Sequence, residues 1–298
     1  MSGKNDEFVV VGLGEILWDM LPAGKQLGGA PANFAYHAHV LGAKSFVASC
    51  VGDDAAGREI IARVEGLGLD SRYIAAAQAH PTGKVDVELD ENGKPGYVIH
   101  ENVAWDFIPP GDALLELAAR VDAVCFGSLC RRSEVSDDTI RRFLRATRHD
   151  CLRVFDINLR QSYYNEEVIA ECLQAATVLK LNDEELCVVA RLLSINGSDS
   201  EIISQLLDRY SLRVIALTQG ASGSVLISAD ARSVVPGVKV AVADTVGAGD
   251  AFTAALVMGL LCGYDLDRIN AVAGRLAGYV CSQIGATPDV PSEVLELL

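Results

Sequence analysis

Residues 244–263 read DTVGAGDAFTAALVMGLLCG, a glycine-rich turn that runs directly into an apolar segment. The segment from Ala251 to Gly263 is too short to span a bilayer and is typical of a buried helix. Small residues at Gly247, Ala248 and Gly249 let an anion approach the backbone closely. The free amides at the start of such a helix, together with its dipole, predict an anion-binding turn.

Asp250 lies at the start of the same helix. A carboxylate repels an anion, so it is an unusual residue for a simple anion site. It suits a turn where the carboxylate takes a proton from a hydroxyl group that attacks a bound phosphoryl group. The residue types alone leave a second interpretation equally open, in which Asp250 only caps the helix.

Strand-like and helix-like segments alternate over most of the chain. A valine-rich run at 8–12 precedes a helical pattern at 31–41, and the next such pair covers 44–51 and 54–66. Further strands are expected at 121–127, 152–157, 176–181 and 212–218, and further helices at 134–149, 166–174, 183–193 and 199–209. This alternation predicts an α/β fold with a mostly parallel sheet covered by helices on both faces.

Residues 82–107 break the alternation. They contain KVDVELDENGKPGYVIHENVAWDF, in which two alternating runs flank an Asn-Gly pair, Asn92-Gly93. This pattern is a strong hairpin signal, so we expect antiparallel strands that stand off the main sheet. Residues 17–27 are expected to add a second such piece. The sequence shows no linker and no repeat, which predicts one domain over residues 1–298 with a small appended sheet.

Composition excludes several classes of protein. Of the 298 residues, 50% are hydrophobic and 22% are charged, as in a compact globular enzyme. The formal net charge of −15 argues against nucleic acid or an anionic membrane surface as a partner. The N-terminal residues lack the pattern of a signal peptide, and we expect a cytoplasmic protein. The eight cysteines form no CxxC pair, which favours reduced core residues over a zinc site.

Two segments resemble the signatures of a known family. DTVGAGDAFTAA, at 244–255, resembles the C-terminal signature of the ribokinase-like, or PfkB, carbohydrate kinases, and GGAPANFA, at 28–35, resembles their N-terminal signature. The resemblance extends over essentially the whole chain. It implies a three-layer sandwich with a small antiparallel β lid, near 15–29 and 82–107. The implied reaction moves the γ-phosphoryl group of ATP to a sugar hydroxyl.

The resemblance also assigns roles to residues of the two signatures. Asp250 becomes the catalytic base, and the turn from Gly247 through Ala248 to Gly249 becomes an anion hole for the transferring phosphoryl group. The residues implied to hold the sugar are Asp19, Gly29 and Asn33. An Asx turn at Asp19 and a polar helix start at Asn33 are the alternatives. Ala30 departs from the lysine that is usual in ribokinases, which points away from ribose.

Two further motifs match the family at strand ends. Asn182 and Glu185, in NDEE, resemble the NxxE motif, which organises Mg²⁺ and its waters around the ATP phosphates. The alternative is a solvated acidic helix start. DINLR, at 156–160, resembles the DxNxR element of fructokinase-type members, in which Arg160 braces the transferring phosphate. The alternative is an ion pair between Arg160 and Asp156.

The remaining implied sites concern the nucleotide and a cation. The expected nucleotide-binding residues are Thr218, Gly220, Gly223 and Asn270, the last with Ala273 beside the adenine. A monovalent cation, K⁺, is expected next to the anion hole, held by Asp244, the carbonyl of Val246 and Gly285. Trp18 and Trp105 fall in the lid segments, where they either cover a sugar face or pack in the core.

Several functions are weighed against one another. The segments GEILWDMLP, DINLR and NVAWDF look most like bacterial fructokinases, with 2-keto-3-deoxygluconate kinase and ribokinase as alternatives. A catalytically silent sugar-binding relative or scaffold is disfavoured, because the base and both anion-hole glycines are present. A dinucleotide-binding fold would need a glycine at position 17, which is Leu17. Exposed lid edges further suggest a homodimer that pairs through the lid.

Overall fold

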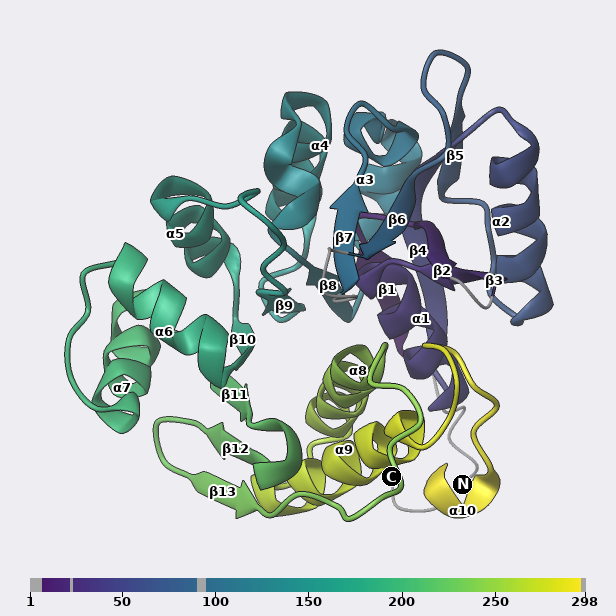
Figure 1. Ribbon diagram of the computed structural model, residues 1–298. Helices are drawn as coiled ribbons and strands as arrows, with labels where there is room; N and C mark the ends of the chain where they lie inside the picture. Colours follow the sequence, from purple (N-terminus) through teal and green to yellow (C-terminus); the bar gives the residue numbers. More distant parts are fainter. Residues whose placement is uncertain (1–6, 22–23, 90–94, 296–298) are drawn as a thin grey trace, which may run out of the picture.

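The computed structural model describes residues 7–21, 24–89 and 95–295 (Figure 1). In this part of the chain the main sheet has nine strands. Their order across the sheet is β13 (Arg232–Val235), β12 (Ser224–Ile227), β11 (Val214–Thr218), β10 (Val178–Asn182), β9 (Leu152–Asp156), β8 (Ala123–Phe126), β1 (Val9–Leu13), β4 (Lys44–Gly52) and β5 (Ile74–Ala77). All pairs from β11 to β5 are parallel, and β12 and β13 are antiparallel additions.

Helices cover both faces of this sheet (Figure 1). One layer contains α1 (Ala30–Val40), α2 (Ala55–Gly66), α8 (Ala248–Leu261) and α9 (Leu266–Cys281). The other contains α3 (Asp112–Ala118), α4 (Glu134–Ala146), α5 (Glu166–Ala175), α6 (Asp183–Leu192) and α7 (Asp199–Tyr210). A short helix, α10 (Ser292–Leu295), lies near the end of the chain. The predicted α/β class and the three layers are confirmed.

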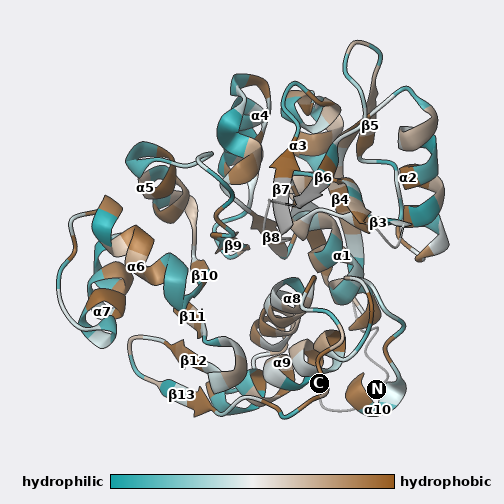
Figure 2. Ribbon diagram, viewed as in Figure 1, coloured by the Kyte–Doolittle hydropathy of each residue, from teal (hydrophilic) through white to brown (hydrophobic). Residues whose placement is uncertain are grey.

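The side-chain pattern explains why the strands have few polar residues. Successive side chains of a strand point to opposite faces, so Val10 packs against α1, α8 and α9, whereas Val11 packs on the other face. Helices cover both faces of the sheet, so side chains on both faces are buried and the parallel strands are apolar along their length. The central helix α8 is buried on most of its surface and is largely white and brown in Figure 2, whereas α2 and α4 carry teal outward faces.

The appended sheet has four described strands. Its order is β3 (Gly24–Gly28), β2 (Leu17–Leu21), β6 (Lys84–Leu89) and β7 (Pro95–Ile99). The β2–β3 and β6–β7 pairs are antiparallel, as expected, but β2 and β6 pair in parallel. The Asn92-Gly93 turn lies outside the described residues. Strands β3 and β7 form the two edges of this lid sheet, and pairing between subunits at those edges stays a prediction.

Of the two alternatives for the tryptophans, covering a sugar or packing in the core, the structure shows both side chains packed. Trp105 lies in a 3-10 turn, η1 (Ala104–Phe107), and is fully buried in the main core. Trp18 packs beneath the lid against α2, and its indole N–H donates to the Ala56 carbonyl at 3.1 Å.

Several elements carry no signal that sequence reasoning could use. The edge strand β5 reads IAAA, in which Ile74 is the one β-branched or aromatic residue of the kind typical of strands. Helix α3 is only seven residues long. Strands β12 and β13 were not expected, although they extend the sheet by a simple hairpin after β11.

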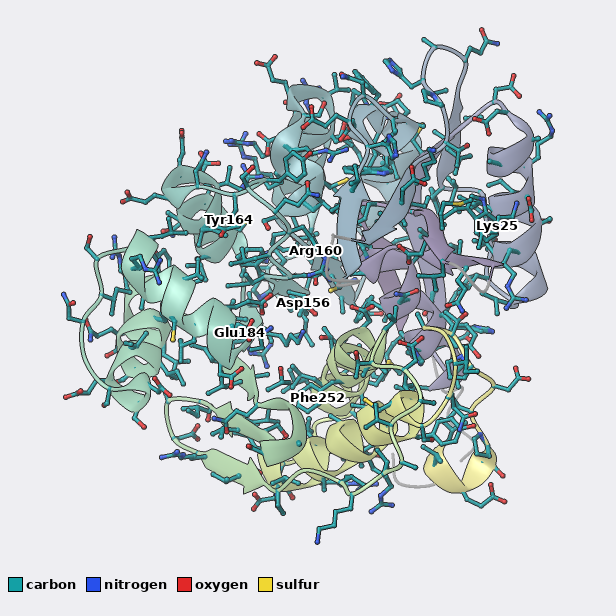
Figure 3. The ribbon with its side chains drawn as sticks, viewed as in Figure 1. Lys25, Asp156, Arg160, Tyr164, Glu184 and Phe252 are labelled. Atoms are coloured by element: carbon teal, nitrogen blue, oxygen red, sulfur yellow. The ribbon has the colours of Figure 1, made fainter. Side chains whose placement is uncertain are left out.

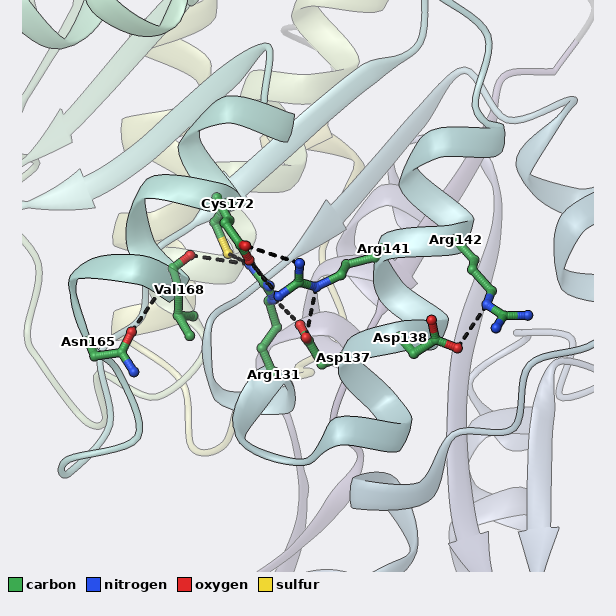
Figure 4. Close-up of polar contacts among 9 residues, drawn as sticks. Arg131, Asp137, Asp138, Arg141, Arg142, Asn165, Val168 and Cys172 are labelled. Atoms are coloured by element: carbon green, nitrogen blue, oxygen red, sulfur yellow. Dashed lines mark hydrogen bonds and ion pairs between the residues drawn. The ribbon is translucent and has the colours of Figure 1, made fainter.

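An arginine-centred network joins α4 to α5 (Figure 4). Arg131, in the turn η2 (Leu129–Arg132), is buried and pairs with Asp137 of α4 and Glu171 of α5. Its guanidinium also donates to the Val168 carbonyl at 3.2 Å. Arg141 pairs with the same two carboxylates, so the network alternates in charge. This network holds α4 and α5, which cover β8 and β9, against each other.

All eight cysteines are free thiols, and five of them are buried, as the sequence predicts for most. In the part of the chain that the structure describes, the helices are too short or too polar to cross a membrane.

Candidate active site

The predicted site residues gather where the parallel strands end. The carboxyl ends of such strands meet at one edge of the sheet, and ligands of open α/β folds bind there. Asn182 ends β10 and is directly opposite Thr218, which ends β11. Figure 3 shows Asp156 and Arg160 beside the end of β9, and Asp156 accepts a hydrogen bond from Thr253 of α8. Segments far apart in the sequence therefore share one site.

Asp250, in the C-terminal signature, contacts the N-terminal signature. Its Oδ2 accepts a hydrogen bond from the Asn33 Nδ2 at 2.9 Å, which joins α8 to α1. Loss of hydration raises the pKa of Asp250 to about 6, helped by the negative charge of Asp156 and opposed by the Asn33 bond and Lys180. The carboxyl group is thus ionised at neutral pH and still basic enough to accept a proton.

The turn before α8 has the shape of an anion site. Gly247 is the N-cap residue of α8 with φ of 80°, and no described side chain caps the helix start. A methyl group on Gly247 would lie 2.6 Å from the Ala286 Cα. Because Asp250 bonds to Asn33 and does not cap α8, the capping interpretation of Asp250 is wrong. The amides of Ala248 and Gly249 remain at a helix start where an anion is favourable.

Beneath this turn lies a buried polar chain that the sequence analysis missed. Lys180 Nζ donates to Asp156 Oδ1 at 3.0 Å, and Thr253 Oγ1 donates to Asp156 Oδ2 at 2.8 Å. Thr253 also donates to the Gly249 carbonyl at 2.9 Å. A charged residue inside the apolar strand sequence VLKLN was the available signal, since lysine is almost never fully buried unless paired.

Arg160 is not the partner of Asp156, so that alternative is wrong. Its side chain is exposed, and its Nη1 donates to the Leu159 carbonyl at 3.0 Å. The positive charge of Arg160 acts on Glu15, Asp19 and Asp250 and partly offsets the rise in their pKa values that burial causes. Arg160 is therefore an exposed cation whose charge reaches these three carboxyl groups.

The expected sugar-binding residues lie together. Burial raises the pKa of Asp19, on β2, to about 6. A methyl group on Gly28 would lie 2.1 Å from Asp19 Oδ2, so only glycine leaves room for this carboxylate. Gly29 has φ of 110°, and a methyl group there would lie 2.4 Å from the Glu15 carbonyl oxygen. The glycine pair thus lets the loop before α1 pass tightly beside Asp19 and Glu15.

Glu15 is a site residue that sequence reasoning overlooked. It is 3% exposed, and burial raises its pKa to about 7. One carboxyl oxygen, Oε2, has no described hydrogen-bond partner. Glu15 lines a small cavity with Asp156, Asn158 and Asp250. The signal was again a charged residue within an apolar run, VVVGLGEILW at 9–18.

The NxxE residues are held in a reciprocal cap of α6. The Asn182 side chain accepts from the Glu185 amide at 2.8 Å, and Glu185 Oε2 accepts from the Asn182 amide at 2.8 Å. Glu185 Oε1 accepts from the Leu159 amide at 3.0 Å. Glu185 is 7% exposed, so the alternative of a solvated acidic helix start holds for Asp183 and Glu184 but not for Glu185. Its remaining lone pairs suit a water of an Mg²⁺ ion better than direct ligation.

On the nucleotide side, the glycines shape a turn after β11. Gly220 and Gly223 have φ of 53° and 109°, and a methyl group on Gly223 would lie 2.0 Å from the Val235 carbonyl oxygen. Asn270 is different, because it is fully buried beneath β12 and β13. Its amide bonds with Ser224 and Ser233. These contacts give Asn270 a packing role, and they argue against the expected contact with adenine; Ala273 is fully buried as well.

The residues expected at the monovalent cation site also meet. Asp244 Oδ1 accepts from the Val246 amide and Oδ2 accepts from the Gly285 amide, both at 3.1 Å. His37 adds a bond from Nε2 to the Ala286 carbonyl at 2.9 Å. These contacts fix the loop beside the anion turn, and cation binding there stays a prediction.

Comparison with known proteins agrees with this geometry. The family model described as pfkB family carbohydrate kinase matches residues 22–293. A fructokinase of Klebsiella pneumoniae is 31% identical, with 92% of each chain covered. The structure of a sugar kinase of Pyrococcus horikoshii in complex with ATP is 27% identical, with a TM-score of 0.79 over 98% of this chain and 100% of that one. The structure of a Vibrio cholerae fructokinase with fructose, ADP and calcium is 22% identical, with a TM-score of 0.79 over 98% and 99%. The chain belongs to the pfkB family of carbohydrate kinases, enzymes that transfer a phosphoryl group to a sugar hydroxyl.

Proposed function

We propose that the protein is an ATP-dependent hexose kinase and that fructose is its substrate. The observation that carries the sugar class is the charge of the pocket. Glu15 and Asp250 line a small cavity of the site, and Asp19 lies beside the Gly28-Gly29 turn as a third carboxyl group. The charge of Arg160 acts on all three. A neutral polyol can donate hydroxyl groups to these oxygens. A sugar acid or a sugar phosphate would add a further negative charge at the same place.

The proposed reaction uses residues from both signatures. Asp19, Gly29 and Asn33 hold the sugar, and the lid sheet closes over it to exclude water. Asp250 takes the proton of the attacking hydroxyl group, whose oxygen forms a bond to the γ-phosphorus as the bond to the ADP oxygen breaks. The proton then leaves Asp250 for solvent.

Charge on the transferring group is stabilised from several sides. The amides of the Gly247–Gly249 turn and the Arg160 guanidinium face the position of this group. Mg²⁺, when bound, neutralises charge on the ATP phosphates. Asn182 and Glu185 would hold its waters, while Thr218, Gly220 and Gly223 would shape the nucleotide side. Asp244, Val246 and Gly285 would bind K⁺ beside the turn.

Two relatives support the choice of sugar and nucleotide. The Klebsiella protein is named a fructokinase, and the Pyrococcus structure holds ATP. The alternatives, 2-keto-3-deoxygluconate kinase and ribokinase, are weaker on different grounds. The first needs a pocket that accepts a carboxylate, and the second usually carries a lysine where this chain has Ala30.

The test is an assay of ADP release over fructose, glucose, ribose, adenosine and 2-keto-3-deoxygluconate, with Mg²⁺ and with or without K⁺. We expect strong turnover with fructose and faster turnover with K⁺. Preference for another sugar would discard fructose and retain the kinase. Sugar binding without turnover on any compound would favour the silent relative.

A further inference from the structure

Lys180 has no role in the reaction as described so far, yet its ammonium group lies beneath the anion turn. A methyl group on Gly249 would be 3.0 Å from Nζ, and the side chain of Lys180 is 9% exposed. The amides of this turn already carry the positive end of the α8 dipole. The lysine therefore adds a full positive charge on the protein side of the same turn.

Lys180 is also the buried cation among three carboxyl groups. Asp156, Glu185 and Asp250 all act on it electrostatically, and Asp156 is its direct partner at 3.0 Å. A buried ion pair is weak as a source of stability, because the loss of hydration offsets most of the attraction. Its presence here therefore needs a reason other than stability.

The geometry of Asp156 supplies the second part of that reason. One oxygen of its carboxylate accepts from Lys180 and the other from Thr253, which is on the first turns of α8 and bonds back to the Gly249 carbonyl. A continuous chain thus runs from β10 through β9 to the anion turn. Any shift of the Lys180 ammonium group would be transmitted to Gly249.

We propose that Lys180 is a positioning residue for phosphoryl transfer, which fixes the anion turn through Asp156 and Thr253 and keeps the catalytic carboxylate of Asp250 charged. The proposal rests on the proposed role of Asp250 as base. Asp250 is faced by Asn33 from α1, Asp156 and Arg160 from the β9 end, Lys180 from β10, and Glu15 from the loop after β1. Of these, Lys180 and Asp156 form a pair whose two charges act on Asp250 in opposite directions.

Opposite shifts of the pH profile give the test. Lys180→Met removes a positive charge, so the acid limb of kcat/KM should move up by on the order of one pH unit. Asp156→Asn removes a negative charge and should move the limb down. Lys180→Arg keeps the charge and should leave the limb near its wild-type position. The ionisation of ATP contributes equally to the pH profile of every variant. Differences between the profiles therefore come from groups of the protein.

Thr253→Val is the matched control, because it changes the positioning of the turn without changing any charge. It breaks the link from Asp156 to the turn, and we expect turnover to fall about 10-fold or less with no movement of the acid limb. If Lys180→Met fails to fold, the double variant Lys180→Met/Asp156→Asn is measured in its place. The double variant leaves no unpaired charge of this ion pair buried. The double variant should keep the acid limb close to that of wild type and lose turnover at the plateau.

Distinct outcomes separate this proposal from the proposed function. An unshifted acid limb in Lys180→Met, with wild-type turnover at its plateau, would overturn the role of Lys180 alone. For the double variant, full wild-type turnover would have the same meaning. No phosphorylation of any sugar by the wild-type enzyme would instead overturn the proposed function.

Discussion

Asn33 and Asp250, separated by 217 positions in the sequence, are joined by a hydrogen bond of 2.9 Å from the Asn33 amide to the Asp250 carboxylate. The bond links the helix after the glycine pair to the helix after the anion turn. It places the predicted sugar-binding side chain against the predicted base. The hydroxyl group that Asp250 would deprotonate must therefore lie beside Asn33.

Replacing Asp250 by Asn should reduce kcat by at least roughly 10²-fold, because the amide cannot accept the hydroxyl proton. The size and the Asn33 contact are nearly preserved, so sugar binding should persist. Coupled ADP release and calorimetric titration with the sugar measure the two quantities. Near-normal turnover in this variant would show that another group is the base.

Removing the Asn33 amide should change the pH profile in a defined direction. The hydrogen bond from Asn33 lowers the pKa of Asp250, which is about 6 in the folded protein. Asn33→Ala should raise that pKa, so activity is lost at a higher pH as the solution is acidified. The KM for the sugar should also increase. A raised KM with an unmoved acid limb would mean that Asn33 contacts only the sugar.

Three glycines should respond to alanine in different ways. Gly247→Ala forces a side chain onto φ of 80° and against the Ala286 backbone, so stability and activity should both fall. Gly249→Ala places a methyl group 3.0 Å from the Lys180 ammonium group and near no backbone atom, and activity should fall more than stability. Gly274→Ala, in α9, meets nothing within 4 Å and should raise the free energy of unfolding by about 0.5–1 kcal/mol.

Urea unfolding and ADP release measure these effects in parallel. Equal losses of activity from Gly247→Ala and Gly274→Ala would contradict the idea that backbone geometry at the anion turn is what matters.

We expect Asn270 to stabilise the fold and not to bind ATP. Asn270→Ala leaves Ser224 and Ser233 without their buried partner, which should lower the free energy of unfolding by about 1–3 kcal/mol. The KM for ATP should stay within about 2-fold of wild type, measured where the variant is folded. Thr218→Ala is the comparison, for which we expect the reverse pattern. A large rise in the KM for ATP in Asn270→Ala would instead support the predicted contact of Asn270 with adenine.

Glu15 should make stability depend on pH. Its pKa is about 7 in the folded protein and about 4.5 ordinarily, so the folded state binds the extra proton between these values. Stability from this group is present at low pH and is lost as pH rises through 7. Glu15→Gln removes that loss and should stabilise the protein at pH 8 by on the order of 2 kcal/mol, but little at pH 4.5.

Urea unfolding at the two pH values tests this expectation. An equal change in stability at both values would show that folding does not raise the pKa of Glu15.

The sequence by itself determined the layers of the fold, and its resemblance to the family predicted Asp250 as the base. Apolar strands alternating with helices require a sheet that is buried on both faces, and this local pattern does not depend on the rest of the chain. The turn before α8 was equally readable, because the conformation of Gly247 and the free amides arise from neighbouring residues. Boundaries of β1, β4 and α2 matched the expected ones to within a residue or two.

Only the tertiary structure decided how the polar groups are paired. Sequence patterns could not tell that Asp156 pairs with Lys180 and not with Arg160, or that Asn270 bonds with two serines of the sheet. Glu15 and Lys180 are single charges within apolar runs of the sequence. A buried charge acquires its pKa and its partner from segments folded against it, and those contacts exist only once the strands lie side by side.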